Sequence, residues 1–406
     1  MNQTLLAQAK NRAAVFEKFL QIELDQEANA SQLAFLDRGI ENSPYQAELS
    51  NYPIYLEQKP MDFSPYPNRG KVPKINTTNL NFLDPEILQA CVCVGRFIDD
   101  QFQTMWMGKN ALEKVQFWST TKIIAGLNIL SQVNTKFPDA KIENWVFQDP
   151  QGRQPDFSFV DAMADVVSYR RKIATSNALS AMLKRFESRS GLERWLIKIT
   201  GNQNLEFRGD YGEDAFIQNP RLVDAKSQKV LLSAIEDAPR GENLLSAYDL
   251  TRIISMVGWH YHLTPSARLP GVTWETLKYV IPALGQDTAR FVDVALDALG
   301  LTDVIYAPVI LSKLGHGPSQ LRNSIETTYV AFVQFIDRLP SQTGQAAQPS
   351  RLRTISMTLR GAIPITNFQD YNQESIRLDA RMAAEVTEIL RRLVSEEFNA
   401  IANGGN

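Results

Sequence analysis

The chain has 406 residues, of which 44% are hydrophobic and 21% charged, so it can bury a large core and is too long for one minimal domain. Its 42 Lys and Arg residues nearly balance its 45 Asp and Glu residues, which leaves a formal net charge of -3. No block of basic residues is present that could follow a phosphate backbone. Nucleic acid is therefore excluded as an expected partner.

The N-terminal region divides into two parts. Residues 4–40 carry apolar side chains near the helical period and predict a helical arm. Residues 42–81 are rich in proline and tyrosine, which excludes a long helix and predicts an extended strap laid over the main domain, outside the catalytic groups. We find no apolar run long enough to span a membrane and no signal peptide in the printed chain, so the compartment stays open.

The rest of the chain predicts strands at both ends of a long helical region. A hairpin is expected from residues 90–94 and 102–107, and Cys91 and Cys93 should lie on one face of its first strand as core residues without a disulfide. The predicted helices cover 119–131, 157–169, 175–187, 191–199, 226–236, 245–258 and 287–299, with an irregular stretch at 202–224. Strands at 307–311, 327–335 and 353–359, a polar loop at 341–350 and a helix at 379–398 follow. This order predicts an α+β fold, an α/β sandwich whose sheet uses both ends of the chain.

The clearest chemical signal is Ser119 followed at i+3 by Lys122, at the start of the helix expected from residue 119. Residues at i and i+3 share a helix face, so the amine can lie beside the hydroxyl. A desolvated lysine is easier to deprotonate and could activate the serine, and the helix N-terminus could stabilise an oxyanion. By itself the spacing also fits a capping serine beside a solvated lysine.

Two further motifs follow in a meaningful order. Thr175 and Asn177 stand in the spacing of an S-x-N motif, and Lys313-Leu314-Gly315 stands on a predicted strand. With the S-x-x-K motif of Ser119, these resemble the penicillin-recognising serine enzymes, class A β-lactamases and penicillin-binding proteins. Residues 242–250 also look like the polar turn and helix that follow the omega loop of that family.

The resemblance implies a domain arrangement. It implies a β-lactamase-like domain at 84–398, with a helical lobe at about 118–300 and a sheet lobe made of 84–117 and 301–398. Residues 1–83 would form the N-terminal helical arm and proline-rich strap, and residues 399–406 a tail. The sheet would be antiparallel with terminal helices.

The resemblance also implies a role for each motif residue. Ser119 would be the acylated nucleophile and Lys122 its proton acceptor. Thr175 would relay a proton to the leaving nitrogen, Asn177 would hold a substrate amide carbonyl, and Lys313 would attract a carboxylate. The expected function is a serine hydrolase acting through an acyl-enzyme on an amide, ester or β-lactam.

The residues after Lys313 complete the expected site. The backbone N–H groups of Ser119 and His316 would form the oxyanion hole, next to Gly315. Leu314 replaces the hydroxyl residue that binds a carboxylate in the family, so we expect it to edge the site and to weaken penicillin recognition. Residues 206–224 lack the family's glutamate-x-x-leucine-asparagine pattern, which predicts a long-lived acyl-enzyme.

Other interpretations stay open at this point. A catalytically impaired member of the family could serve as a peptide- or protein-binding module. The His316 side chain could act as a general base, although its place after Gly315 favours a backbone role. His260 and His262 lie two apart without a further ligand motif, so no metal is expected, and no cofactor motif is found. The expected partner is a small-molecule or peptide substrate, and the family usually works in the cell envelope or periplasm.

Overall fold

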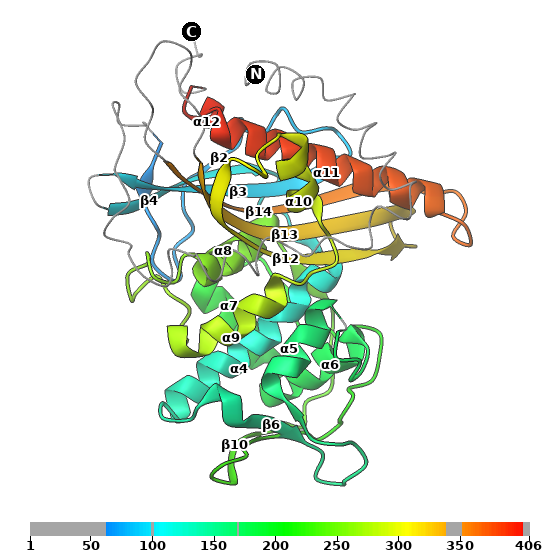
Figure 1. Ribbon diagram of the computed structural model, residues 1–406. Helices are drawn as coiled ribbons and strands as arrows, with labels where there is room; N and C mark the ends of the chain where they lie inside the picture. The colour runs from blue at the N-terminus through cyan, green and yellow to red at the C-terminus, as the bar shows by residue number, and fades with distance from the viewer. Residues whose placement is uncertain (1–61, 99–100, 169, 338–350, 401–406) are drawn as a thin grey trace. The chain divides into compact units, whose positions relative to one another are not determined.

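The computed structural model describes residues 62–98, 101–168, 170–337 and 351–400 (Figure 1). The predicted helical arm, the first half of the strap and the loop at 341–350 lie outside the described residues. The chain forms two compact units. The sheet unit contains described residues up to Tyr66, then Pro73–Ala111, and those from Ala289 onward; the helical unit contains Pro67–Val72 and Leu112–Thr288.

The sheet unit is built on one sheet in the order β1-β4-β3-β14-β13-β12. Neighbouring strands in this order are antiparallel, and β2 pairs with β4 in parallel. The strands are β1 (Ser64–Pro65), β2 (Ile75–Asn76), β3 (Ile87–Ile98), β4 (Gln101–Lys109), β12 (Ile305–Ser319), β13 (Ser324–Asp337) and β14 (Arg351–Pro364). The predicted hairpin and the three later strands are confirmed, and the α+β class with them. The described end of the strap contributes β1 and β2 to this sheet.

One face of the sheet packs against two helices, α10 (Phe291–Ala298) and α11 (Asn372–Val394), and α12 (Glu397–Ala400) follows. Figure 1 shows α11 lying over the sheet, roughly along its strands. Alternate residues such as Ile310, Tyr329 and Met357 enter this core, as the period of two along a strand requires. Cys91 and Cys93 are both buried and form no disulfide.

Within its described residues, the helical unit contains six longer helices, two small sheets and three short 3-10 turns, η2, η3 (Ile142–Asn144) and η4 (Lys184–Phe186). Its helices are η2 (Trp118–Lys122), α4 (Ile123–Lys136), α5 (Phe159–Ser168), α6 (Ser176–Leu183), α7 (Arg189–Thr200), α8 (Ala247–Gly258) and α9 (Trp274–Leu284). One sheet has the order β10-β9-β6-β7 and the other β5-β11-β8. Their strands are β5 (Val115–Gln116), β6 (Trp145–Gln148), β7 (Phe157–Ser158), β8 (Glu206–Phe207), β9 (Arg221–Asp224), β10 (Lys229–Ser233) and β11 (Asn243–Leu245).

Three sequence-based expectations differ from the structure. The helix predicted at 226–236 is wrong, because residues 229–233 form β10 in a hairpin with β9. Asp224 builds the turn by accepting hydrogen bonds from the next backbone N–H groups, and Gln228 has a left-handed φ of 58°. Helix α9 was not predicted, and its pattern is interrupted by Pro282. Helix α10 belongs to the sheet unit, so the helical unit ends at Thr288 and not near 300.

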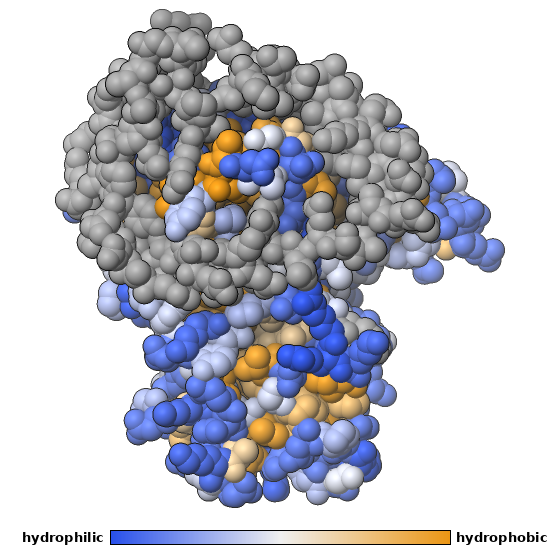
Figure 2. Space-filling view, in the orientation of Figure 1, coloured by the Kyte–Doolittle hydropathy of each residue, from blue (hydrophilic) through white to orange (hydrophobic). Residues whose placement is uncertain are grey.

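A cavity of about 350 Å³ opens in the helical unit between α5 and α9. Its walls combine apolar side chains with polar ones and are formed by Val160, Asp161, Ala164, Arg170, Arg171, Tyr279, Pro282, Ala283 and Gln286. Figure 2 shows hydrophobic residues at the surface of this unit in the region where Figure 1 draws α5, α6 and α9. None of the predicted site residues lines the cavity.

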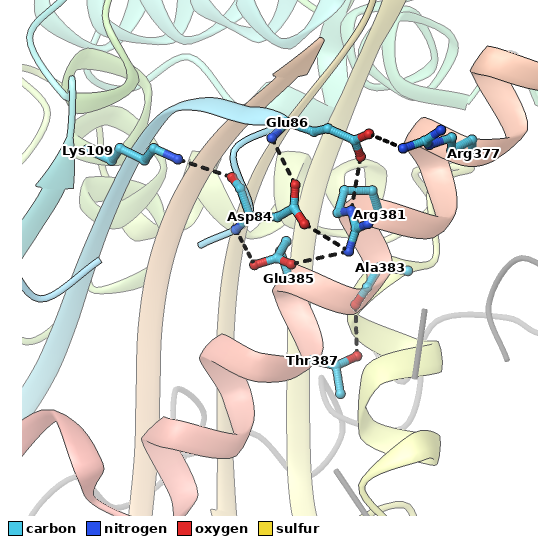
Figure 3. A network of polar contacts seen from close by, with 8 residues as sticks. All are labelled: Asp84, Glu86, Lys109, Arg377, Arg381, Ala383, Glu385 and Thr387. Atoms are coloured by element: carbon cyan, nitrogen blue, oxygen red, sulfur yellow. Dashed lines mark hydrogen bonds and ion pairs between the residues drawn. The ribbon is translucent and has the colours of Figure 1, made fainter. Parts of the chain in front are cut away.

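Polar contacts fasten α11 to the chain that enters β3 (Figure 3). Arg381 of α11 lies 3.2 Å from the Asp84 carboxylate and 3.0 Å from that of Glu86. The buried Glu385 accepts a hydrogen bond from the Asp84 N–H at 3.2 Å, and Lys109 donates to the Asp84 carbonyl at 3.1 Å. These contacts join two segments about 300 residues apart, which fixes how α11 lies on the sheet.

No described helix combines the length and the hydrophobicity needed to cross a membrane.

Candidate active site

Ser119 lies in the 3-10 turn η2, one turn before the α-helix α4 begins. The sequence placed it on the α-helix itself, but a 3-10 turn at a helix start is common, and it eclipses side chains at i and i+3. Ser119 is half-buried, and its hydroxyl makes no hydrogen bond among the described residues. It follows Trp118, whose φ of 48° is unusual for a bulky residue. Backbone strain of this kind costs of order 1–3 kcal/mol and clusters at functional sites.

Lys122 is the central charged group of this region. Its side chain is buried, with 2% of the residue exposed. The amine donates a hydrogen bond to Ser176 Oγ at 2.8 Å and another to Asn177 Oδ1. These contacts join the end of η2 to the first turn of α6. The structure thus brings Lys122 and Asn177 together.

At the start of α6, the side chains of Thr175 and Ser176 contact different residues. Thr175 caps α6 by accepting from the Ala178 N–H at 3.1 Å, and its hydroxyl donates to Glu213. Glu213 also accepts from Asn177 Nδ2 at 2.9 Å. The hydroxyl that contacts the Lys122 amine therefore belongs to Ser176, which the sequence analysis did not single out. Ser176 stands inside the same three-residue motif, directly after Thr175, at the first position of α6.

An aromatic ring separates Lys122 from a second buried lysine. The Tyr211 ring centroid lies 5.5 Å from the Lys122 amine and 5.2 Å from that of Lys184. The Tyr211 hydroxyl lies 3.2 Å from Thr121 Oγ1, and burial raises the pKa of Tyr211. A cation facing an aromatic ring at this distance is attracted by the ring quadrupole. Tyr211 thus helps to hold the Lys122 amine in a fixed place.

Lys184 holds the segment that carries Tyr211. Its amine donates to the Gly209 carbonyl and to Asn243 Oδ1, both at 2.7 Å, and lies 3.6 Å from the Phe207 ring centroid. Burial lowers the pKa of Lys184 well below its usual value, and the neighbouring Arg189 lowers it further. These contacts are structural, because they end on a backbone carbonyl and an amide of the helical unit.

The third predicted motif lies on β12 in the sheet unit. Lys313 is buried, and its amine donates to the Leu314 carbonyl at 2.7 Å. Leu314 packs against the core cluster under α11, so alternation along the strand puts Lys313 and Gly315 on the opposite face. The expectation that Leu314 edges the same site as Lys313 does not fit this packing, because the sequence could not show which face α11 covers.

His316 shares the α11 face with Leu314. Its Nδ1 lies 2.9 Å from Thr327 Oγ1 on β13, and its Nε2 lies 3.4 Å from Ser375 Oγ on α11. Since β12 is the last strand in the order, alternate backbone N–H groups point away from β13. The predicted backbone role of His316 in an oxyanion hole stays a prediction.

Metal ligands do not gather in the described part of the chain. No group of three or more His, Cys, Asp or Glu side chains is arranged there to hold a metal ion. His260 is buried, and desolvation together with the nearby Arg268 lowers its pKa to about 4.

The chain has been compared with known proteins at three levels. No protein-family model matches it, and no curated protein matches it. Among solved structures, an ancestral class A β-lactamase (GNCA) aligns at 14% identity over 76% of this chain and 94% of its own, with a TM-score of 0.42. A β-lactamase from Desulfarculus baarsii aligns at 15% identity over 75% and 92%, with a TM-score of 0.40. The class A β-lactamase of the last common ancestor of Gram-negative bacteria (GNCA4) aligns at 13% identity over 74% and 93%, with a TM-score of 0.41.

Proposed function

We propose that this protein is a serine hydrolase that forms an acyl-enzyme on Ser119, with Lys122 as the base. The observation that carries the proposal is the position of Lys122. It is buried, it follows Ser119 by one 3-10 turn, and its amine is held by Ser176 and Asn177. The left-handed Trp118 before the serine supports the same centre.

The chemistry is an acyl transfer. Ser119 Oγ attacks the carbonyl carbon of an amide, ester or β-lactam, and its proton passes to a neutral Lys122 amine. Burial penalises the charged form of an amine, which favours this role. The Ser176 hydroxyl, which contacts the same amine, can pass the proton to the leaving nitrogen or oxygen as its bond to carbon breaks. Asn177 is placed to orient the substrate, and water later releases the acyl group.

The lifetime of the acyl-enzyme depends on how water is activated. Glu213 is the carboxylate that contacts Asn177, and its two oxygens accept hydrogen bonds from Thr175 and Asn177. Because both oxygens are engaged, we propose that deacylation is slow. The label should then accumulate on the protein.

Covalent labelling tests the assignment of Ser119. The full-length protein is treated with a fluorophosphonate probe and, separately, with a fluorescent penicillin, and the labelled peptide is identified by mass spectrometry. Trypsin releases Ser119 in the peptide 115–122, where it is the sole serine. We expect the label there, and Ser119→Ala should remove it. The matched control is Ser190→Ala, a half-buried helical serine of the same unit. An unlabelled peptide 115–122 in the wild type would contradict the proposal.

We also propose that the buried Lys313 amine on β12 attracts a carboxylate.

A further inference from the structure

Four polar side chains form a chain of hydrogen bonds on the α11 face of the sheet unit. Ser375 Oγ lies 3.4 Å from His316 Nε2, and His316 Nδ1 lies 2.9 Å from Thr327 Oγ1. Thr327 Oγ1 in turn donates to Asp379 Oδ1 at 3.1 Å. The sequence analysis left open a side-chain role for His316, and the function proposed for Ser119 does not use it.

The fold explains why these residues meet. His316 and Thr327 are direct partners in the register of β12 and β13, so their side chains lie side by side on one face. Ser375 and Asp379 are four residues apart on α11 and therefore share one helix face. Figure 1 shows the first turns of α11 beside the ends of β12 and β13.

The hydrogen bonds fix where the protons are. Thr327 has a single hydroxyl proton and donates it to Asp379, so its oxygen accepts from His316 Nδ1–H. A neutral imidazole carries one N–H, which leaves Nε2 as an acceptor for the Ser375 hydroxyl. The protein around His316 partly desolvates its ring and lowers its pKa from the ordinary value, which favours the neutral form.

This arrangement has the parts of an activated nucleophile: a hydroxyl, a base beside it and groups that orient the base. We propose that Ser375 is a second reactive serine, which accepts an acyl group from activated esters with His316 as the base. Thr327 and Asp379 are positioning residues that act through His316. Ser375 is half-buried and His316 is exposed, so a small ester can reach both.

The proposed step balances without a further reactant. Ser375 Oγ bonds to the carbonyl carbon of the ester as its proton moves to His316 Nε2. The bond from that carbon to the leaving oxygen then breaks, and His316 returns the proton to the departing alcohol. With a fluorophosphonate, the oxygen bonds to phosphorus and fluoride leaves with the proton.

The test uses the full-length protein with Ser119→Ala, so that labelling at the first centre cannot contribute. Trypsin releases Ser375 in the peptide 361–377, where it is the sole serine. We expect a fluorophosphonate probe to label this peptide, and Ser375→Ala to remove the label while Ser190→Ala leaves it. Absence of label on peptide 361–377 would overturn the proposal. This result is independent of peptide 115–122 in the unsubstituted protein, so failure of either proposal is recognisable by itself.

Substitutions of Thr327 and Asp379 test whether these residues position His316 or only stabilise the fold. Thr327→Val keeps the shape of the buried side chain and removes the hydrogen bonds, so labelling of Ser375 should slow at least ten-fold. Thr327→Ser restores the hydroxyl and should bring the rate back to within about three-fold of the parent, a difference of about 0.7 kcal/mol. Asp379→Asn is a second probe on a half-buried residue, and should also slow labelling. Unchanged rates in both Thr327→Val and Asp379→Asn would refute the relay.

Discussion

Replacing Lys122 by methionine separates the chemical role of the amine from its role in packing. Methionine keeps most of the volume of the buried side chain and removes the amine. Ser176 Oγ and Asn177 Oδ1 then each lose a donor, which costs roughly 1–3 kcal/mol per group. Removing the buried amine also removes the cost of desolvating it, which is roughly 1–3 kcal/mol for a neutral polar group. These terms oppose each other, so the free energy of unfolding should change by less than about 2 kcal/mol.

The reaction rate should respond much more strongly than stability. General-base catalysis contributes about 10²- to 10⁴-fold, so labelling of Ser119 should slow by that factor, or about 3–5 kcal/mol in the barrier. The assay compares second-order labelling rates with urea denaturation of the same preparations. The matched control is Lys184→Met, which removes the other buried lysine beside Tyr211 and should slow labelling less than ten-fold. A Lys122→Met protein that reacts within three-fold of the wild-type rate would refute the assigned role.

Three further predictions concern stability and side-chain direction. The pKa of His260 is about 4 in the folded protein and 6.5 in the unfolded chain, so the unfolded state binds the proton first as pH drops. The free energy of unfolding should therefore fall between pH 6.5 and pH 4, by about 3 kcal/mol at pH 4. Urea titrations should show a smaller fall in His260→Gln. Gly201→Ala should lower the thermal unfolding temperature more than Gly212→Ala. Both glycines have a φ near 80°, but only a Cβ at 201 would meet the Gly70 backbone, at 2.6 Å. An equal decrease in the two variants would disprove the contact. Leu314→Thr should lower the free energy of unfolding by about 1 kcal/mol, since Leu314 packs under α11. The rate of penicillin labelling should not change. Faster labelling would instead show that the Leu314 side chain lies at the proposed active site.

The sequence alone determined the elements whose pattern is strong and locally consistent. The strands later found as β13 and β14 show apolar and β-branched runs, and α11 shows a long amphipathic pattern, so their type did not depend on context. The spacing of Ser119 and Lys122 likewise fixed that both lie on one side of a helical turn. The family resemblance singled out Lys122 and Asn177 as site residues, but not their contact with each other.

The tertiary structure decided what local pattern leaves ambiguous. Residues 229–233 have an apolar run that suits a helix, and they form a strand because β9 offers an edge to pair with. Ser176, rather than Thr175, contacts Lys122. The Thr175 hydroxyl is already engaged, because its oxygen caps α6 and its proton is donated to Glu213. A strand pattern gives two alternating faces but does not label them, so only the placement of α11 could show that Leu314 and His316 point away from Lys313. The same placement brings Ser375 to His316 across 59 positions of sequence, a distance over which local spacing carries no information.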